Sequence, residues 1–186
     1  MSLELSEDSI IEKVISGEKE AYRYLVEKYK DLSYSLALKI VKDPMQAEEV
    51  AQEAFIKAYR SLKMFNKKSK FSTWLFRIVY TTAISLLRKE KKYVSYDDTV
   101  NTEPMEDENN SLEQNDRKVL LENALATLGP EDSTAVTLYY LHQYSMDEVA
   151  ETMGLKISTV KVKIHRARKK LASELRKVLN EEVVNL

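Results

Sequence analysis

The stretch SMDEVAETMGLKISTVKVKIHRARKKLASEL, residues 145–175, decides the fold of the C-terminal part of this chain. Ser145 followed by Glu148 is a capping-box pattern, which begins a short helix. Gly154 stands where the chain is expected to turn sharply with a positive φ. A second helix is expected from about Ser158, because apolar residues then recur at spacings of three and four: Val160, Ile164, Ala167 and Leu171. The pattern predicts a helix-turn-helix.

The second helix of this motif has a strongly basic face. The segment from Lys156 to Lys177 contains nine Lys or Arg residues and one acid, Glu174, a net charge of +8 in a chain whose total is −1. A helix that is apolar on one side and basic on the other suits the DNA major groove, and its charge suits phosphates. The alternative is a helical hairpin with a solvated basic face, which the charge excess disfavours.

The composition favours an all-helical protein of one domain or two small ones. The chain has 186 residues, 44% of them hydrophobic and 32% charged, with three Gly, three Pro and no Cys. Its two histidines, His142 and His165, are far apart in the sequence, so no metal site and no cofactor are expected. It has neither an apolar run of membrane-spanning length nor a secretory signal, which predicts a cytoplasmic protein. No catalytic motif is present, so an enzyme is not expected.

The charges fall into blocks that suggest two domains. Residues 57–92 carry a net charge of +10, and residues 93–116 carry eight acids and no Lys or Arg. Basic blocks on either side of an acidic one predict two nucleic-acid-facing helical domains, at 1–92 and 115–186, joined by a flexible acidic linker at 93–114. The linker is either an inert spacer or a segment that mimics nucleic acid in a basic channel.

Turn and cap signals divide the first domain into helices. Ser6 is expected to cap a short helix that ends at Gly17, and a long helix follows over about 18–42. Asp43 and Pro44 begin another helix to about residue 62, with Gln46 completing a capping box. Ile56 lies on the polar face of this helix, and the residues leave two interpretations open: a solitary exposed apolar residue or the centre of a partner-docking surface.

A basic loop at 64–70 precedes a helix expected from Ser72, its N-cap, to about residue 91. This helix has an outward polar stripe at spacings of four, four and three, suited to nucleic acid or simply solvated: Arg77, Thr81, Ser85 and Arg88. Trp74 is either a core anchor or a platform for an unpaired base. Further helices are expected at 117–128 and from Pro130 to about Leu141, which gives the second domain four helices.

Three motifs together resemble the extracytoplasmic-function (ECF) sigma factors of the sigma-70 family, the bacterial promoter-recognition subunits of RNA polymerase. AEEVAQEAFIKAY (47–59) is similar to the polymerase-binding helix of region 2, and FSTWLFRIVYTTAISLLRK (71–89) to the segment that recognises and melts the −10 element. Residues 128–171 resemble region 4, which reads the −35 element. The motifs follow the family's order and span nearly the whole chain.

This resemblance implies roles for particular residues. The positions expected to bind polymerase are Glu49, Gln52, Glu53 and Ile56. Those expected to face −10 DNA are Lys68, Lys70, Trp74, Arg77, Thr81, Ser85, Arg88 and Lys89. Those expected to face −35 DNA are Thr159, Lys161, Val162, Lys163, His165 and Arg166. Thr81 stands where the family often carries Asn, Ser85 where it often carries Asp or Asn, and Val162 where Ser is common, so the hydrogen-bonding groups differ here.

The resemblance also implies partners: core RNA polymerase, promoter DNA and an anti-sigma factor, with the free chain a monomer that does not insert into membranes. The residues alone leave two further function classes open. One is a conventional dimeric helix-turn-helix regulator, which would bind paired half-sites without polymerase. The other is an interaction protein that mimics a sigma factor, which the basic recognition face disfavours.

Overall fold

The computed structural model describes residues 6–94, 121 and 123–184, and all regular structure in these residues is helical. The expected linker at 93–114 lies almost entirely outside the described residues. The elements are α1 (Glu7–Ser16), η1 (Lys19–Ala21), α2 (Tyr22–Val41), α3 (Pro44–Ser61), η2 (Leu62–Met64), α4 (Phe71–Val94), α6 (Pro130–Val136), η3 (Thr137–Leu141), α7 (Met146–Met153) and α8 (Ile157–Val184). The predicted all-α fold is confirmed.

The caps predicted in the first domain are largely present. Ser6 accepts a hydrogen bond from the backbone N–H of Ser9 at 3.3 Å, and Gly17 ends α1 at φ 112°. The Asp43 carboxylate accepts from the backbone N–H of Gln46 at 2.8 Å. The expected capping box at this point is wrong in one half, because the Gln46 side chain donates to Glu90 of α4 at 2.6 Å instead.

Three helices differ in their boundaries from the sequence expectation. Residues Lys19–Ala21 form a 3₁₀ turn before α2. Helix α4 begins at Phe71, so Ser72 lies in its first turn rather than capping it, and the helix runs on to Val94. The helix from Pro130 gives way to a π-turn at Thr137–Leu141, which lets the chain bend toward the helix-turn-helix.

The N-terminal unit, α1 to α4, has a core rich in large side chains. Helices α2, α3 and α4 pack on one another, and Phe71, Phe76 and Leu75 are at most 2% exposed. Tyr29 packs its ring 5.7 Å from that of Phe71, and its hydroxyl donates to Glu7 of α1 at 2.5 Å. Burial of these rings fixes the direction of α4 and of the loop before it.

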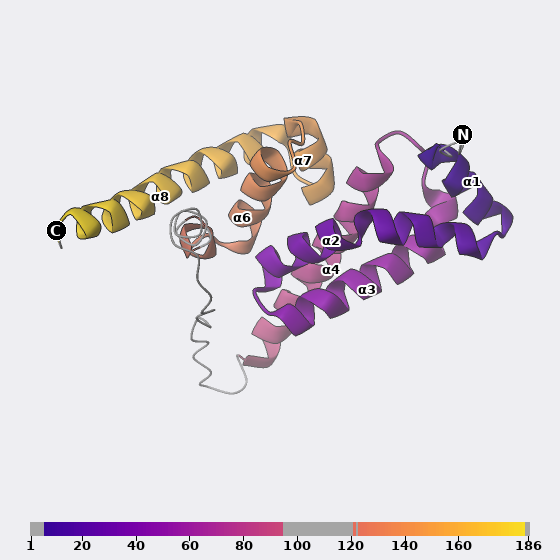
Figure 1. The fold of residues 1–186 in the computed structure, drawn as a ribbon, viewed down its shortest axis with the longest axis horizontal. Helices are drawn as coiled ribbons and strands as arrows, with labels where there is room; N and C mark the ends of the chain where they lie inside the picture. The colour runs from indigo at the N-terminus through magenta and orange to yellow at the C-terminus, as the bar shows by residue number, and fades with distance from the viewer. Residues whose placement is uncertain (1–5, 95–120, 122, 185–186) are drawn as a thin grey trace.

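The C-terminal unit, which comprises residues 121 and 123–184, packs directly against the first (Figure 1). One continuous core runs across the boundary and includes Leu138, Val149 and Ile164. A smaller separate cluster lies inside the C-terminal unit, formed by Leu125, Leu128, Val136 and Ala167. The sequence left the relative placement of the two units open, and the structure joins them along α4 and α7. We call this contact the seam.

Candidate nucleic-acid interface

The helix-turn-helix predicted at 145–175 is present as α7 and α8. Ser145 Oγ accepts from the backbone N–H of Glu148 at 3.2 Å, and the Glu148 carboxylate accepts from the backbone N–H of Ser145 at 2.9 Å. Gly154 takes the left-handed conformation at φ 64°, where a residue with a side chain would be strained. These local contacts fix the angle at which α8 leaves α7.

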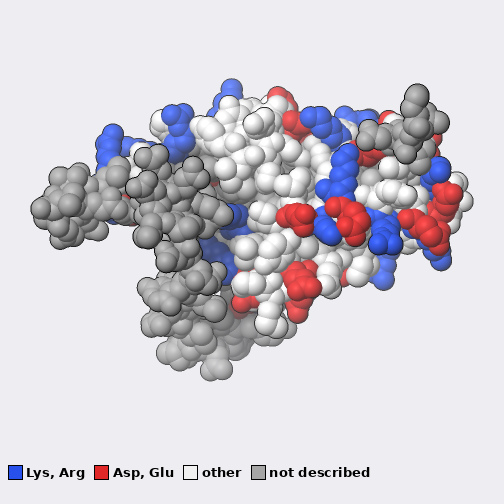
Figure 2. All heavy atoms as spheres, viewed as in Figure 1, with Lys and Arg blue, Asp and Glu red and all other residues white. Residues whose placement is uncertain are grey.

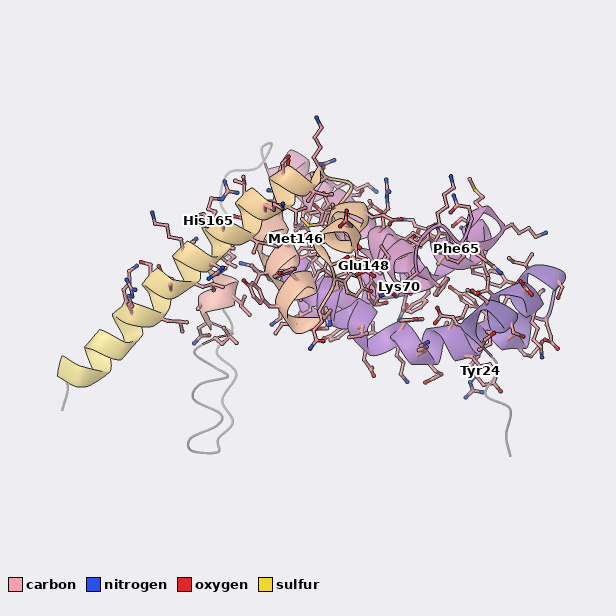
Figure 3. All side chains as sticks on the ribbon, turned by 90° about the horizontal axis from the view of Figure 1, so that it is seen from above. Tyr24, Phe65, Lys70, Met146, Glu148 and His165 are labelled. Atoms are coloured by element: carbon pink, nitrogen blue, oxygen red, sulfur yellow. The ribbon has the colours of Figure 1, made fainter. Side chains whose placement is uncertain are left out.

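Helix α8 buries one stripe and exposes the other. Val160, Ile164 and Ala167 are at most 4% exposed and pack toward α6 and α7. The opposite side carries the exposed residues that were expected to face −35 DNA: Thr159, Lys161, Val162, His165 and Arg166. Lys and Arg side chains line the outer edge of α8 in Figure 2, and His165 lies on the helix away from α2 in Figure 3. This face of α8 is therefore free to contact the major groove of a DNA duplex.

Two cations of α8 are paired with carboxylates of α6. Arg166 donates from Nε and Nη2 to the two oxygens of Asp132 at 3.0 and 2.9 Å. Lys163 Nζ lies 2.5 Å from Glu131 and 3.6 Å from Asp132, and its side chain is 13% exposed. Lys163, expected at the DNA surface, therefore lies at the edge of the buried stripe, whereas Arg166 stays 63% exposed while paired.

The stripe expected on α4 is exposed along its length. Arg77, Thr81, Ser85, Arg88 and Lys89 are all exposed. The Thr81 hydroxyl donates to the carbonyl of Arg77 at 2.8 Å, and the Ser85 hydroxyl donates to that of Thr81 at 2.7 Å. Because each hydroxyl proton is used within the helix, these two side chains present only acceptor lone pairs to an incoming ligand.

The basic loop before α4 is ordered by its own lysines and by the aromatic core. Lys67, at φ 56°, pairs with Glu12 of α1 at 2.7 Å, and Lys68 is exposed. Trp74 is partly buried, with its ring 5.3 Å from Phe65. Trp74 thus packs on the aromatic core while remaining partly exposed, and its role as a platform for an unpaired base stays a prediction.

The face of α3 expected to bind polymerase is also exposed. Glu49, Gln52, Glu53 and Ile56 all point outward, and Ile56 is 45% exposed. Met45, 76% exposed, continues the same stripe one turn earlier. The sequence reasoning missed Met45, although its spacing of four from Glu49 and of eleven from Ile56 places it on the same helix face.

The seam brings some residues of the two candidate DNA surfaces close together. Lys70 Nζ lies 2.8 Å from Glu148, and Figure 3 shows the two residues where α7 meets the N-terminal unit. The Tyr144 ring stacks on Phe76 with centroids 6.0 Å apart. A cavity of about 340 Å³ at the seam is lined by Arg88 of α4, by Glu131 and Asp132, and by Lys163 and Arg166.

Burial and ion pairing shift several pKa values at the seam. The hydrogen bond from Lys70 lowers the pKa of the Glu148 carboxyl, and the Ser145 backbone N–H lowers it further. Burial raises the pKa of Tyr144 against a hydrogen bond from Ser72. Burial also raises the pKa of Tyr80 to about 12, with Glu131 adding to the effect. Glu148 is therefore ionised and the tyrosines neutral at pH 7.

Among the described residues, no cluster of three His, Cys, Asp or Glu side chains could hold a metal ion. Within the same part of the chain, no helix combines the length and the apolar character that crossing a bilayer requires.

Comparisons with known proteins place both units in one family. The model of Sigma-70 region 2 matches residues 25–93, and that of Sigma-70 region 4 matches residues 118–171. The ECF RNA polymerase sigma factor SigW of Bacillus subtilis is 32% identical over 89% of this chain and 95% of its own. The RNA polymerase sigma-H factor of Pseudomonas aeruginosa is 34% identical over 94% of this chain and 96% of its own.

Solved structures share the fold. The sigma factor RpoE of Bartonella quintana, solved with the anti-sigma factor NepR, superposes with a TM-score of 0.69 at 24% identity, over 83% of this chain and 96% of its own. CnrH, solved with the cytosolic domain of CnrY, gives a TM-score of 0.66 at 22% identity, over 90% of this chain and 96% of its own. The helical fold is therefore shared with proteins of low sequence identity.

Proposed function

Because this chain belongs to the ECF sigma factors of the sigma-70 family, we propose that it binds core RNA polymerase through α3 and reads promoter DNA through α4 and α8. A sigma factor is a transcription initiation factor and not itself an enzyme: it directs the polymerase to promoters and aids strand opening. We assign residues 1–92 to region 2, residues 93–114 to the linker and residues 115–186 to region 4. The site of action is then the cytoplasm.

The proposed polymerase surface consists of Met45, Glu49, Gln52, Glu53 and Ile56. Its exposed apolar side chains, Met45 and Ile56, flank a row of acidic and amide groups on one helix face. Exposed apolar side chains beside polar groups on one face are typical of a protein-docking site. This exposed face is the observation that favours polymerase binding over a function limited to DNA.

The proposed −10 surface joins the α4 stripe to the loop lysines and Trp74. Positive side chains would hold the phosphate backbone, and the partly exposed Trp74 ring would contact an unpaired base. Lys68, Arg77 and Arg88 supply the charge, whereas Thr81 and Ser85 supply acceptors for base amino groups. Capture of unstacked bases offsets the few kcal/mol that unstacking costs.

The proposed −35 surface is the exposed face of α8. Lys161, His165 and Arg166 would reach phosphates and base edges, and Val162, which is 62% exposed, would contact a thymine methyl group. Neutralisation of phosphates by these cations makes binding steeply dependent on salt. The free protein is proposed to be a monomer, with an anti-sigma factor as a second protein partner.

The polymerase surface is tested by adding purified core bacterial RNA polymerase to the wild-type chain and to Ile56→Asp, and measuring affinity by biolayer interferometry. Placing a charge in an apolar contact is expected to weaken core binding by about 10-fold or more. Asp31→Asn, at an exposed position of α2 outside the proposed polymerase surface, is the control and is expected to bind as the wild type does. An Ile56→Asp protein that melts at a lower temperature than the wild type would instead place Ile56 in the core.

The promoter-reading function is tested by run-off transcription from a pool of genomic promoters. Transcripts that require this protein and disappear with Lys161→Ala are the expected result, since one base contact provides about 1–3 kcal/mol. Tight binding of duplex DNA by the isolated chain as a dimer, without polymerase, would favour the conventional regulator instead.

A further inference from the structure

The ion pair between Asp132 and Arg166 orients the exposed arginine of α8. Asp132 lies in the first turn of α6, and its side chain is 16% exposed. It accepts from Nε of Arg166 at 3.0 Å and from Nη2 at 2.9 Å, one oxygen for each donor. Two parallel hydrogen bonds hold the plane of a guanidinium, whereas one bond leaves it free to rotate.

The donors that remain on Arg166 match one base. A guanidinium carries five N–H groups in a plane, and Asp132 engages the edge formed by Nε and Nη2. The neighbouring edge, formed by Nη1 and Nη2, keeps its own pair of donors, and the side chain is 63% exposed. A planar pair of donors is complementary to O6 and N7 of guanine in the major groove.

The position of Arg166 on α8 also favours contact with a base. Val162 precedes Arg166 by one helical turn and is 62% exposed, so the two side chains share the face proposed to enter the groove. Lys163 lies on the flank of this face, 13% exposed and tied to Glu131 and Asp132. Because Lys163 is the second cation beside Asp132, it helps to neutralise that carboxylate and reduces the repulsion between Asp132 and DNA phosphates.

We propose that Asp132 is a positioning residue for −35 recognition, holding Arg166 so that its Nη1–Nη2 edge reads a guanine. This inference rests on the proposed role of α8 in the major groove. It assigns Lys163 to joining α6 and α8 rather than to base contact. Helix α6 thereby contributes to sequence preference through a residue that does not touch DNA.

The chain offers a matched control beside Asp132. Glu131 precedes it in the same helical turn and carries the same charge, yet it pairs with Lys163 at 2.5 Å and not with Arg166. Glu131→Gln and Asp132→Asn therefore remove equal charge from the same place. Only Asp132→Asn removes an acceptor from Arg166.

The test uses holoenzyme reconstituted with core bacterial RNA polymerase. Its probe is a duplex library built on a promoter recovered by run-off transcription, with the upstream element randomised. Selection and sequencing give a preference for each base at each position. The wild type is expected to prefer guanine at one position by about 5- to 150-fold, the range of one bidentate contact.

Arg166→Lys is expected to abolish the guanine preference, because Lys keeps the charge without the fork, while total affinity for the library changes little. Asp132→Asn is expected to lower the preference at that same position about 5-fold or more, within the range of the contact it supports. Glu131→Gln is expected to match the wild type. Adding Asp132→Asn to Arg166→Lys is expected to have no further effect at that position.

The contrary outcomes separate the two levels of inference. A guanine preference that depends on Arg166 but persists in Asp132→Asn overturns the positioning role alone. An equal loss at every position in Asp132→Asn, with a lower melting temperature, also overturns it, because such a loss marks a purely structural residue. A wild-type holoenzyme without base preference in the randomised element overturns the −35 role of α8, and the inference with it.

Discussion

The two units of this molecule obtain their stability in different ways. The N-terminal unit encloses Phe71, Phe76 and Leu75, each at most 2% exposed, between three long helices. The C-terminal unit encloses a cluster of four small to medium side chains, and its remaining buried residues, such as Leu138 and Val149, join the core of its neighbour across the seam. Because hydrophobic stabilisation follows the apolar area buried, the C-terminal unit depends on the seam more than the N-terminal unit does.

This difference affects the proposed function. The two proposed DNA surfaces lie on opposite sides of the seam, and the Arg77 guanidinium lies within 4 Å of the space beside Gly154, at the turn of the helix-turn-helix. A −10 and a −35 element are separated by many base pairs of about 3.4 Å each, far more than these contacts span. A chain that reads both elements at once must separate at the seam, and the C-terminal unit must stay folded when it does.

The largest loss of stability is expected from a substitution in the core that both units share. Leu75→Ala is expected to destabilise the chain by about 2–5 kcal/mol, because it leaves a cavity in a fully buried site. Leu128→Ala removes the same groups from the C-terminal cluster. We expect Leu75→Ala to lower amide protection in both α3 and α8, and Leu128→Ala to lower it in α8 alone. Hydrogen exchange with mass spectrometry measures both, and equal loss in α3 from the two variants would contradict the comparison.

The next largest loss of stability is expected from a change at the seam. Tyr144→Ala is expected to cost about 1–3 kcal/mol, since it removes a partly buried ring that stacks on Phe76 at 6.0 Å. Amide exchange should rise in α7 and α8 and stay unchanged in α3. Tyr144→Phe is the control, because it keeps the ring and loses only the hydroxyl that bonds Ser72.

Energy transfer between two fluorophores can show whether Tyr144→Ala also changes the distance between α3 and α8. The chain contains no cysteine, so single cysteines can be introduced for labelling at Glu49 of α3 and Arg176 of α8, both exposed. Energy transfer is expected to fall in Tyr144→Ala and to stay at the wild-type value in Tyr144→Phe. Unchanged transfer in Tyr144→Ala would show that the seam holds without this ring.

Local chemistry explains which parts of the fold could be predicted from the sequence. Ser145, Glu148 and Gly154 lie within ten residues of one another, and their capping and turn preferences act over that range, so the helix-turn-helix followed from the residues. The exposure of Ile56 followed in the same way from helical periodicity. The resemblance to sigma factors supplied the roles, which periodicity could not.

Contacts between distant residues explain what the sequence could not give. The side chain of Gln46 has its partner 44 positions away in Glu90, so its local capping pattern was misleading. Asp132 and Arg166 are 34 positions apart, and no periodicity links them. The packing of α7 on α4 depends on shape complementarity across a linker of more than twenty residues, which leaves no local signal.

The smallest expected effect is electrostatic and tests whether the Lys70–Glu148 pair at the seam contributes to its stability. Lys70 lowers the pKa of Glu148, so the pair stabilises the seam above the ordinary glutamate pKa of about 4.3. That contribution is lost as the pH falls through the lowered pKa of the folded state, because protonation removes the charge that Lys70 holds. For so exposed a pair we expect less than about 1 kcal/mol.

Lys70→Gln should therefore lower the protection of α7 at pH 7 and make it less dependent on pH on the acid side. Lys67→Gln is the matched control: Lys67 lies in the same loop and pairs with Glu12 within the N-terminal unit, at 2.7 Å. It removes the same charge without touching the seam. If both variants changed α7 protection equally, the effect would come from the general charge of the loop, and the seam would rest on its apolar contacts alone.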